Sequence, residues 1–222
     1  MRGVPAASLP RYLLDFPPVN AVTHSVFGAG ALAGASLVLG LEPAWYAYPA
    51  AVVAALVPDL DNPRSKLGNG LSAMRSPLLN LVTRPLSWLL RAISFTLFNT
   101  VGHRTLTHSL LGLGAFALLA GLLLRAMGGP GYGILLALVA GYASHLAADA
   151  LNTRGVPLLW PAGGEVRLLP GGVKSGGLAE LVVAVCAVAA AGYLAYLVHP
   201  GLQDHVSGVL PGGFSLGTVT PP

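Results

Sequence analysis

Charged side chains are scarce in this sequence. Lys, Arg, Asp and Glu make up 9% of the 222 residues, and 54% of the residues are hydrophobic, whereas soluble domains average about 25% charged residues. This scarcity argues against a soluble domain and indicates a chain that folds in a membrane. Cysteine is nearly absent too. The one cysteine, Cys186, excludes an internal disulfide and a thiolate metal cluster, and its place inside an apolar run predicts a core residue.

Five uncharged apolar runs are candidates for membrane spans, judged against the roughly 20 residues that a helix needs to cross hydrocarbon. The first two runs are short and rich in Gly and Ala, which favours a tightly packed helical hairpin. The sequence therefore predicts an all-α fold in one domain, residues 1–222: a polytopic membrane helix bundle of about five transmembrane helices. The predicted spans are 25–41, 43–58, 107–124, 131–150 and 179–198.

The segments between and around these runs have other signatures. Residues 76–98 are apolar but broken by two arginines and a proline, so we expect an interfacial amphipathic segment within a cytoplasmic insertion, 62–102. Residues 155–177 read as two extended pieces around a Gly turn, which predicts a small cytoplasmic hairpin or loop. Residues 1–20 are expected as an N-terminal interfacial segment without a cleaved signal peptide, and 200–222 as a flexible tail.

The distribution of Lys and Arg predicts the orientation, because cytoplasmic loops carry an excess of these residues. With the N terminus inside, eleven of the twelve fall on the cytoplasmic side, and only Arg125 falls outside. This predicts a multi-pass protein of the cytoplasmic (inner) membrane. A basic face against anionic headgroups accounts for the net charge of +4, so no nucleic-acid partner is expected.

Ionisable residues collect at the cytoplasmic ends of the predicted spans. Residues of this kind inside a membrane are costly and mark functional sites. Their convergence from distant parts of the chain predicts one shared site at this boundary. The eight residues are His24, Asp59, Asp61, His103, His108, His145, Asp149 and Glu180.

The spacing within these motifs suits a shared site. His145 and Asp149 are four residues apart, so they lie on one face of a helix and can hold one ion or form a carboxylate–histidine pair. Asp59 and Asp61 follow a proline, where an irregular helix end lets both carboxylates turn toward the same point.

The motif "HRTLTHS" adds two histidines five residues apart, which are roughly 140° apart around an ideal helix. Both can reach one site only if His103 lies in the loop before the helix that carries His108, with Thr107 as the N-cap. Imidazole and carboxylate together are the ligands expected for zinc, manganese or iron, whereas magnesium and calcium prefer oxygen. The motif is therefore interpreted as one wall of a metal site at the membrane surface.

The same residues have structural explanations. The aspartate pair can end a helix, His145 and Asp149 can join helices by hydrogen bonds, and Glu180 suits the N-terminal end of its helix. The coincidence of all of them at one boundary favours the functional interpretation. His199 and His205 have no carboxylate cluster nearby and are expected as surface residues on the outer side.

Several motifs together resemble the YdjM-like family of membrane-bound metal-dependent hydrolases. They are "THSVFGAGALAG", "VPDLD", "GHRTLTHS", "GYASHLAADALNTRGVPLLWP" and "GGVKSGGLAELV", and they cover most of the chain in this order. The family is distantly similar to the zinc-dependent phospholipase C and nuclease fold, a helical bundle with several zinc ions. The resemblance implies metal ligation by His24, Asp59, Asp61, His103, His108, His145, Asp149 and Glu180.

These observations favour an enzyme that uses a metal-activated water on a phosphoester of a lipid or lipid-linked substrate at the cytoplasmic face. Two or three zinc ions are expected, with manganese or iron as alternatives, and homo-oligomerisation is left open. We expect Asp61, Arg104 and Asp149 to act in catalysis. The residues expected to hold the phosphate are Arg104, Asn152, Arg154 and Lys174.

Two other functions use the same residues. A transport or ion-binding protein would place ionisable groups near the bilayer midplane with a path to the outer face, and the outer halves of the predicted spans are almost bare of polar groups. A noncatalytic scaffold would have a structural metal with a closed coordination shell.

Overall fold

A computed structural model describes residues 20–61, 87–89, 91–92, 95–96, 99–100, 105–129, 131–174 and 177–209. Among these residues there is no β-strand, and two isolated bridges join Asn152 to Val173 and Val156 to Val166. The predicted all-α class is confirmed. The named elements are α1 (Asn20–Val38), α2 (Ala47–Ala54), the 3-10 helices η2 (Pro58–Asp61) and η3 (Leu106–His108), α4 (Leu110–Ala126), α5 (Tyr132–Ala150), α6 (Leu178–Val198) and α7 (Pro200–Val209).

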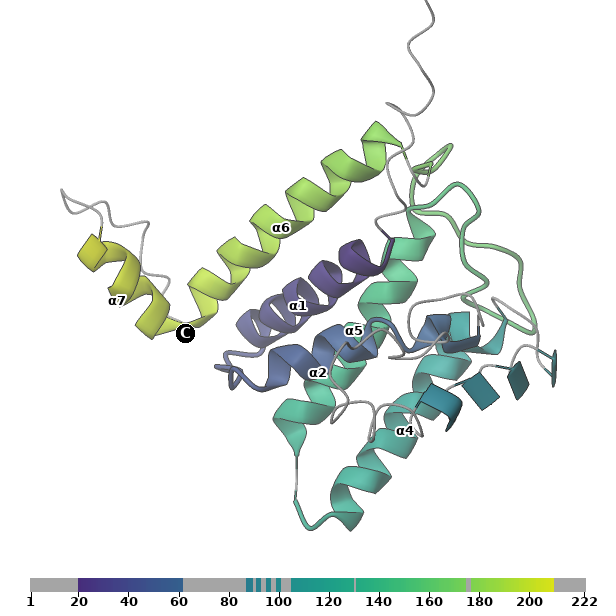
Figure 1. The fold of residues 1–222 in the computed structure, drawn as a ribbon, viewed down its shortest axis with the longest axis horizontal. Coiled ribbons are helices and arrows are strands. Elements are labelled where there is room, and N and C mark those ends of the chain that lie inside the picture. The colour runs from purple at the N-terminus through teal and green to yellow at the C-terminus, as the bar shows by residue number, and fades with distance from the viewer. Residues whose placement is uncertain are drawn as a thin grey trace, which may run out of the picture.

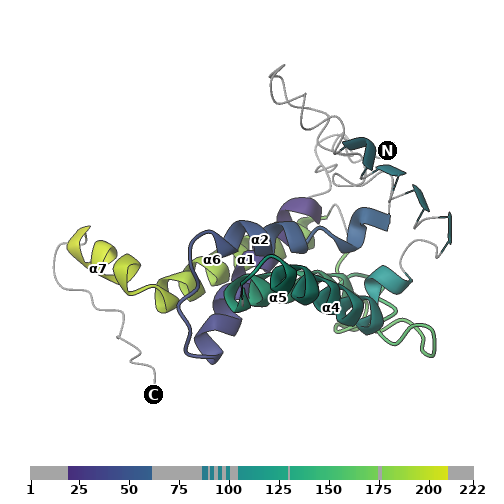
Figure 2. The same ribbon diagram turned by 90° about the horizontal axis from the view of Figure 1, so that it is seen from below.

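Helix α1 is the centre of the bundle. It packs against α2, α5 and α6, while α2 and α4 each also pack against α5 (Figures 1 and 2). A Cβ atom added at Gly28 of α1 would lie 2.8 Å from the carbonyl oxygen of Ala51, and one added at Gly141 of α5 would lie 2.2 Å from the same oxygen. Helix α2 therefore fits between α1 and α5 because both neighbours have glycine at the contact, in line with the Gly and Ala content of the first two runs.

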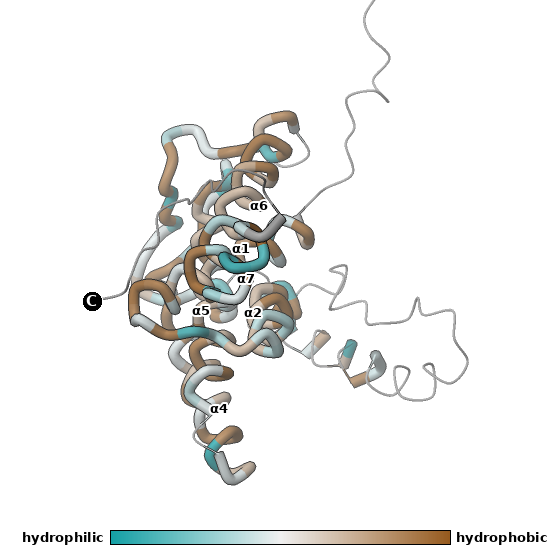
Figure 3. The backbone as a smooth tube through the Cα atoms, turned by 90° about the vertical axis from the view of Figure 1, so that its left-hand side faces the viewer, coloured by the Kyte–Doolittle hydropathy of each residue, from teal (hydrophilic) through white to brown (hydrophobic). Residues whose placement is uncertain are grey.

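Within the described ranges, three helices are long and apolar enough to cross a membrane: α1 from Ala21 to Val38, α5 and α6. They correspond to the first, fourth and fifth predicted spans. The third predicted span corresponds to α4, a mainly apolar helix whose 17 residues extend about 26 Å at 1.5 Å per residue. Figure 3 shows hydrophobic and pale residues along α4, with hydrophilic colour near its C-terminal end.

The second predicted span, 43–58, is shorter than expected. Helix α2 has eight residues, so it rises only about 12 Å, against a hydrocarbon core of about 30 Å. The helix ends before Pro58, because a proline disfavours helical geometry in the residue before it and has no amide proton to donate. The backbone that follows leaves α-helical geometry and continues as the short 3-10 helix η2, and it is covered by protein, since Ala55, Pro58 and Asp61 are buried. Irregular backbone at membrane depth is tolerated only when it is covered or lines a cavity.

The helix ends that carry the ionisable motifs lie on one side of the bundle. The start of α1, η2, η3, the end of α5 and the start of α6 are all on the right-hand side in Figure 1. The loop after α5 folds back on that helix, with the amide of Leu168 donating to Ala150 and the amide of Val173 donating to Leu151. The antiparallel topology of the helices thus produces the predicted convergence.

Several segment predictions lie wholly or mainly outside the described residues. They concern the N-terminal segment 1–20 apart from Asn20, and the insertion 62–102 with its amphipathic part, of which only the short pieces 87–89, 91–92, 95–96 and 99–100 are described. The segment 200–222, expected as a flexible tail, begins with helix α7.

Candidate metal centre

Helix α5 supplies two ligand-type side chains one turn apart. His145 and Asp149 are both buried, and His145 Nε2 lies 3.9 Å from Asp149 Oδ2. His145 Nδ1 lies 2.7 Å from the carbonyl oxygen of Ala55, which can only accept. The Nδ1 atom therefore carries the proton, and Nε2 keeps its lone pair toward the site. The backbone after α2 thus fixes the orientation of the imidazole.

Helix η3 supplies His108, directly before α4. His108 is fully buried, and its Nδ1 lies 3.0 Å from Thr107 Oγ1 and 3.5 Å from Asp61 Oδ2. The Thr107 hydroxyl in turn donates to Asp61 Oδ2 over 2.6 Å. Carboxylates placed in this way orient metal-binding histidines. Thr107 was expected as the N-cap of the next helix, but Ser109 is the N-cap, and its hydroxyl accepts from the amide of Gly112.

Three side-chain atoms converge on the other ring nitrogen of His108, Nε2, and make with it a group of four atoms. His108 Nε2 lies 3.3 Å from His145 Nε2, 3.6 Å from Asp149 Oδ2 and 3.8 Å from Asp59 Oδ1. His145 Nε2 is 3.9 Å from each of these two carboxylate oxygens. A tetrahedral ion with ligands at about 2.0–2.1 Å has ligand–ligand edges of about 3.3–3.4 Å. The ligand-type atoms of His108, His145 and Asp149 therefore lie close enough together to hold one metal ion after a small contraction, and Asp59 Oδ1 lies within 3.9 Å of both histidines.

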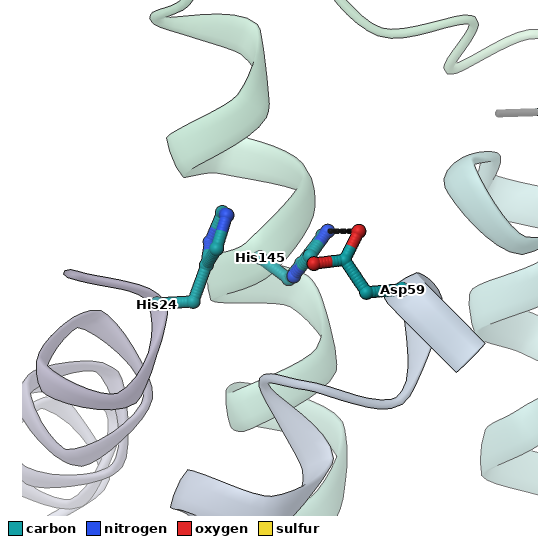
Figure 4. A group of neighbouring side chains, drawn as sticks. All are labelled: His24, Asp59 and His145. Carbon is teal, nitrogen blue, oxygen red and sulfur yellow. Dashed lines mark ion pairs between the residues drawn. The ribbon is translucent and has the colours of Figure 1, made fainter. Parts of the chain in front are cut away.

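His24 of α1 extends this group. Its ring stacks on that of His145, with centroids 4.0 Å apart and planes inclined by 19°, and Figure 4 shows His24 and Asp59 on opposite sides of His145. His24 Nε2 lies 3.6 Å from Asp149 Oδ1, so the two oxygens of this carboxylate face different histidines. The other ring nitrogen of His24 is buried and has no hydrogen-bond partner in the described part of the chain. His24 therefore adds a second candidate ligand group, with Asp59 and His145.

A narrow crevice borders His24 on the side of α6. It has a volume of about 20 Å³ and is lined in part by His24, Asn152 and Glu180, which is room for one water molecule or ion. Asn152 Nδ2 donates to Asp149 Oδ1 over 3.1 Å, so Asn152 helps to orient this carboxylate. Glu180 is buried at the start of α6, where its carboxylate can serve the same crevice.

The electrostatic balance of the centre calls for a cation. Burial raises the pKa of Asp59 above its ordinary value, while the nearby imidazoles of His24 and His108 lower it. Buried carboxylates are costly unless they are paired or coordinate metal. Asp59 is also the most open member of the group, with 27% of its side chain exposed, compared with 3% for Asp149. Water can therefore reach the centre from the Asp59 side.

Four other residues were predicted to belong to the site: Arg154, Lys174, His103 and Arg104. Arg154 and Lys174 are exposed, and they follow Asn152 and Val173, the two residues that an isolated bridge joins in the loop after α5. They therefore lie on the same loop, beside the end of the helix that carries Asp149. His103 and Arg104 lie outside the described residues, and their roles stay predictions.

A second polar cluster, which the sequence did not predict, lies at the opposite end of the bundle. His199 was expected on the surface, but it is 2% exposed: Nε2 is 3.0 Å from the Tyr48 hydroxyl, Nδ1 is 3.4 Å from Glu42 Oε1, and the ring stacks on Trp45. His205 is exposed, as predicted. The sequence did contain one signal for this cluster. His199 and Glu42 both lie on the outer side of the predicted spans, and a buried histidine requires a polar partner.

Asp61→Asn is expected to lower metal affinity about 10–100-fold, the usual effect of losing a carboxylate that orients a ligating histidine. The number of ions bound at saturating metal stays the same, because the four convergent atoms remain. Isothermal titration of the metal-free protein with zinc measures both values. A loss of stoichiometry in this variant would show instead that Asp61 is itself a ligand.

Comparisons with known proteins agree with these observations. The model of the YdjM inner membrane protein family matches residues 19–201. Inner membrane protein YdjM of Escherichia coli (strain K12) and that of Shigella flexneri are each 38% identical to this chain over 127 residues, which are 56% of this chain and 54% of theirs. The uncharacterized protein YvsG of Bacillus subtilis is 30% identical over 179 residues, 81% of this chain and 96% of its own. The match thus spans about half the length of the two YdjM proteins. No solved structure matches the chain significantly.

Proposed function

Since the chain belongs to the YdjM inner membrane protein family, we propose that it is a membrane-bound, metal-dependent phosphoesterase. The observation that carries this proposal is the convergence of His108, His145, Asp59 and Asp149 at distances that suit one divalent ion. A bound zinc or manganese ion supplies a nucleophilic water at neutral pH and neutralises charge on a phosphoryl oxygen.

The side chains around this centre divide the remaining work. Asp61 holds His108 through its Nδ1, and the Ala55 carbonyl holds His145 in the same way. Asp149 Oδ1 faces His24 Nε2, so these two residues would help to hold a second ion. Two ions a few ångströms apart can stabilise both the attacking and the leaving oxygen of a phosphoester.

The phosphate is proposed to bind at the loop after α5. Arg154 and Lys174 are exposed there beside the metal centre, and Arg104 belongs to the same motif as His108. Arginine offers paired donors to phosphate oxygens and cannot ligate the ion. These residues therefore bind and orient the anion without competing for the metal.

The substrate is proposed to be a lipid or lipid-linked phosphoester at the cytoplasmic face. The one-sided distribution of Lys and Arg supports an inside N terminus and a cytoplasmic centre. His24 lies close to the start of a span-length helix, and His145 and Asp149 close to the end of another. The centre is therefore near the headgroup level of one leaflet, where a lipid phosphate would be present.

Transport is supported less well than hydrolysis. The cluster around His199 does add polar groups at the far end, but a packed apolar layer lies between the two clusters. Its core residues, which are at most 1% exposed, are Leu32, Ala47, Ala51 and Ala137. A conducting path would need polar groups or water across this layer.

A substrate panel tests the proposed function. Purified zinc-loaded protein is expected to release phosphate, or a phosphorylated headgroup, from at least one of a set of phospholipids, lipid pyrophosphates and soluble phosphodiesters. Addition of a chelator is expected to stop turnover, and zinc or manganese to restore it. Transport gains support over hydrolysis if no phosphoester is hydrolysed and the protein in proteoliposomes carries zinc across the bilayer.

A further inference from the structure

An apolar groove lies between α5 and α6, alongside α1, which packs against both helices. Its volume of about 520 Å³ is within the range of about 300–1,000 Å³ that is usual for ligand sites. The one hydroxyl in its lining, that of Ser144, donates to the backbone of Gly141. Lining residues include Phe27 and Gly30 of α1, Ser144 and Ala147 of α5, and Ala187 and Ala190 of α6.

The groove borders the narrow crevice at the metal centre. Phe27 and Val183 line both the groove and the narrow crevice that contains His24 and Glu180. A molecule in the groove would therefore end beside His24, whose buried Nδ1 has no partner among the described residues. This shared border distinguishes the groove from an ordinary lipid-facing depression.

The length of the groove suits a single hydrocarbon chain. Its lining on α6 runs from Val182 to Leu194, which is about 18 Å along the helix. One leaflet is half of a hydrocarbon core of about 30 Å. The groove thus starts at the level of the metal centre and extends to about the bilayer midplane, as one extended acyl or prenyl chain does.

We propose that this groove binds the hydrocarbon chain of the substrate, so that the substrate is a phosphoester carrying a long chain that lies along α6. The inference rests on the proposed function and specifies its substrate class. The polar end of the molecule lies at the crevice beside His24, while water enters from the Asp59 side. Long-chain phosphoesters are therefore preferred to soluble ones because their chains gain contacts in the groove.

Two tryptophan variants of α6 test the groove. Ala190 lines the groove, whereas its neighbour Ala189 is also exposed but does not line it. Ala190→Trp is expected to raise the KM for a long-chain phosphatidic acid about tenfold, the loss that follows when about two methylene groups are excluded. Ala189→Trp leaves this KM unchanged. Both variants retain the wild-type metal content and the wild-type rate with a short-chain, water-soluble phosphodiester.

A labelling experiment gives a readout that does not require turnover. Phosphatidic acid with a diazirine in the middle of one acyl chain is mixed into phosphatidylcholine nanodiscs that hold the full chain, and the photolabelled residues are identified by mass spectrometry. Labels are expected on groove residues in the wild type and in Ala189→Trp, and about tenfold fewer in Ala190→Trp.

The outcomes separate this inference from the proposed function. Labels spread evenly around α6 in all three proteins would overturn it in favour of bulk lipid, and chain-to-chain products through α6 would overturn it in favour of a second copy. Groove labelling without hydrolysis of any phosphoester would contradict the proposed enzyme and keep the lipid-chain site. Hydrolysis without groove labelling would contradict the lipid-chain site and keep the proposed enzyme.

Discussion

His145→Ala is expected to remove bound metal from the purified protein. A four-ligand zinc site is worth about 10–16 kcal/mol in small structural domains, so one ligand contributes about a quarter of that, or about 10²–10³ in affinity. His145 belongs to both candidate ligand groups, with His108 and Asp149 and with His24 and Asp59. Its loss therefore weakens both, and phosphoester hydrolysis is expected to fall below detection.

Elemental analysis after dialysis measures the metal content of this variant. His199→Ala is the matched control, because His199 is equally buried but belongs to the opposite end of the bundle. That control loses its contacts with Tyr48 and Glu42 and is expected to cost about 1–3 kcal/mol of unfolding free energy while keeping its metal. Equal metal content in wild type and His145→Ala would show that His145 is not a ligand.

His24→Ala is expected to reduce the bound metal from two ions to one and to lower turnover about 10²–10³-fold, comparable to the loss of one preorganised transition-state stabiliser. The first ion stays because its four ligand atoms do not include His24. The second ion is lost because His24 Nε2 and Asp149 Oδ1 are the pair that faces it. Metal stoichiometry and kcat on the same preparation separate binding from catalysis.

Ser36→Ala on the same helix is the control for this variant. Ser36 is fully buried and, like His24, has a polar atom without a hydrogen-bond partner among the described residues. It lies about 18 Å farther along α1, so its loss is expected to leave both ions in place. A His24→Ala protein with two ions and normal turnover would restrict the site to a single ion.

The sequence predicted the side of the bundle on which the site forms, because each motif is at a helix end and alternating helix directions bring those ends together. It could not assign the partners of individual atoms. Asp59 and Asp61 are equivalent in a spacing argument, yet one faces the four-atom group and the other faces the far nitrogen of His108. That difference depends on the Thr107 hydroxyl, which lies 46 residues from Asp61 in the chain.

Two other predictions failed for physical reasons that act over long range. The burial of His199 depends on Glu42, Trp45 and Tyr48, which come from the connection before α2 and from α2 itself. The shortness of α2 depends on the loss of helical geometry before Pro58, combined with close packing on Gly28 and Gly141. Hydropathy alone describes neither effect, because it counts residues along one run.

X-ray absorption spectroscopy of the zinc-loaded protein tests the central claim most directly, because it reports the ligands of the ion itself. The predicted spectrum has a first shell of about four nitrogen and oxygen atoms at about 2.0–2.1 Å, with the outer-shell scattering of at least two imidazoles. His145→Ala should lose this pattern. A shell of oxygen atoms alone, or zinc that is removed by washing, would contradict a metal centre built from His108, His145, Asp59 and Asp149.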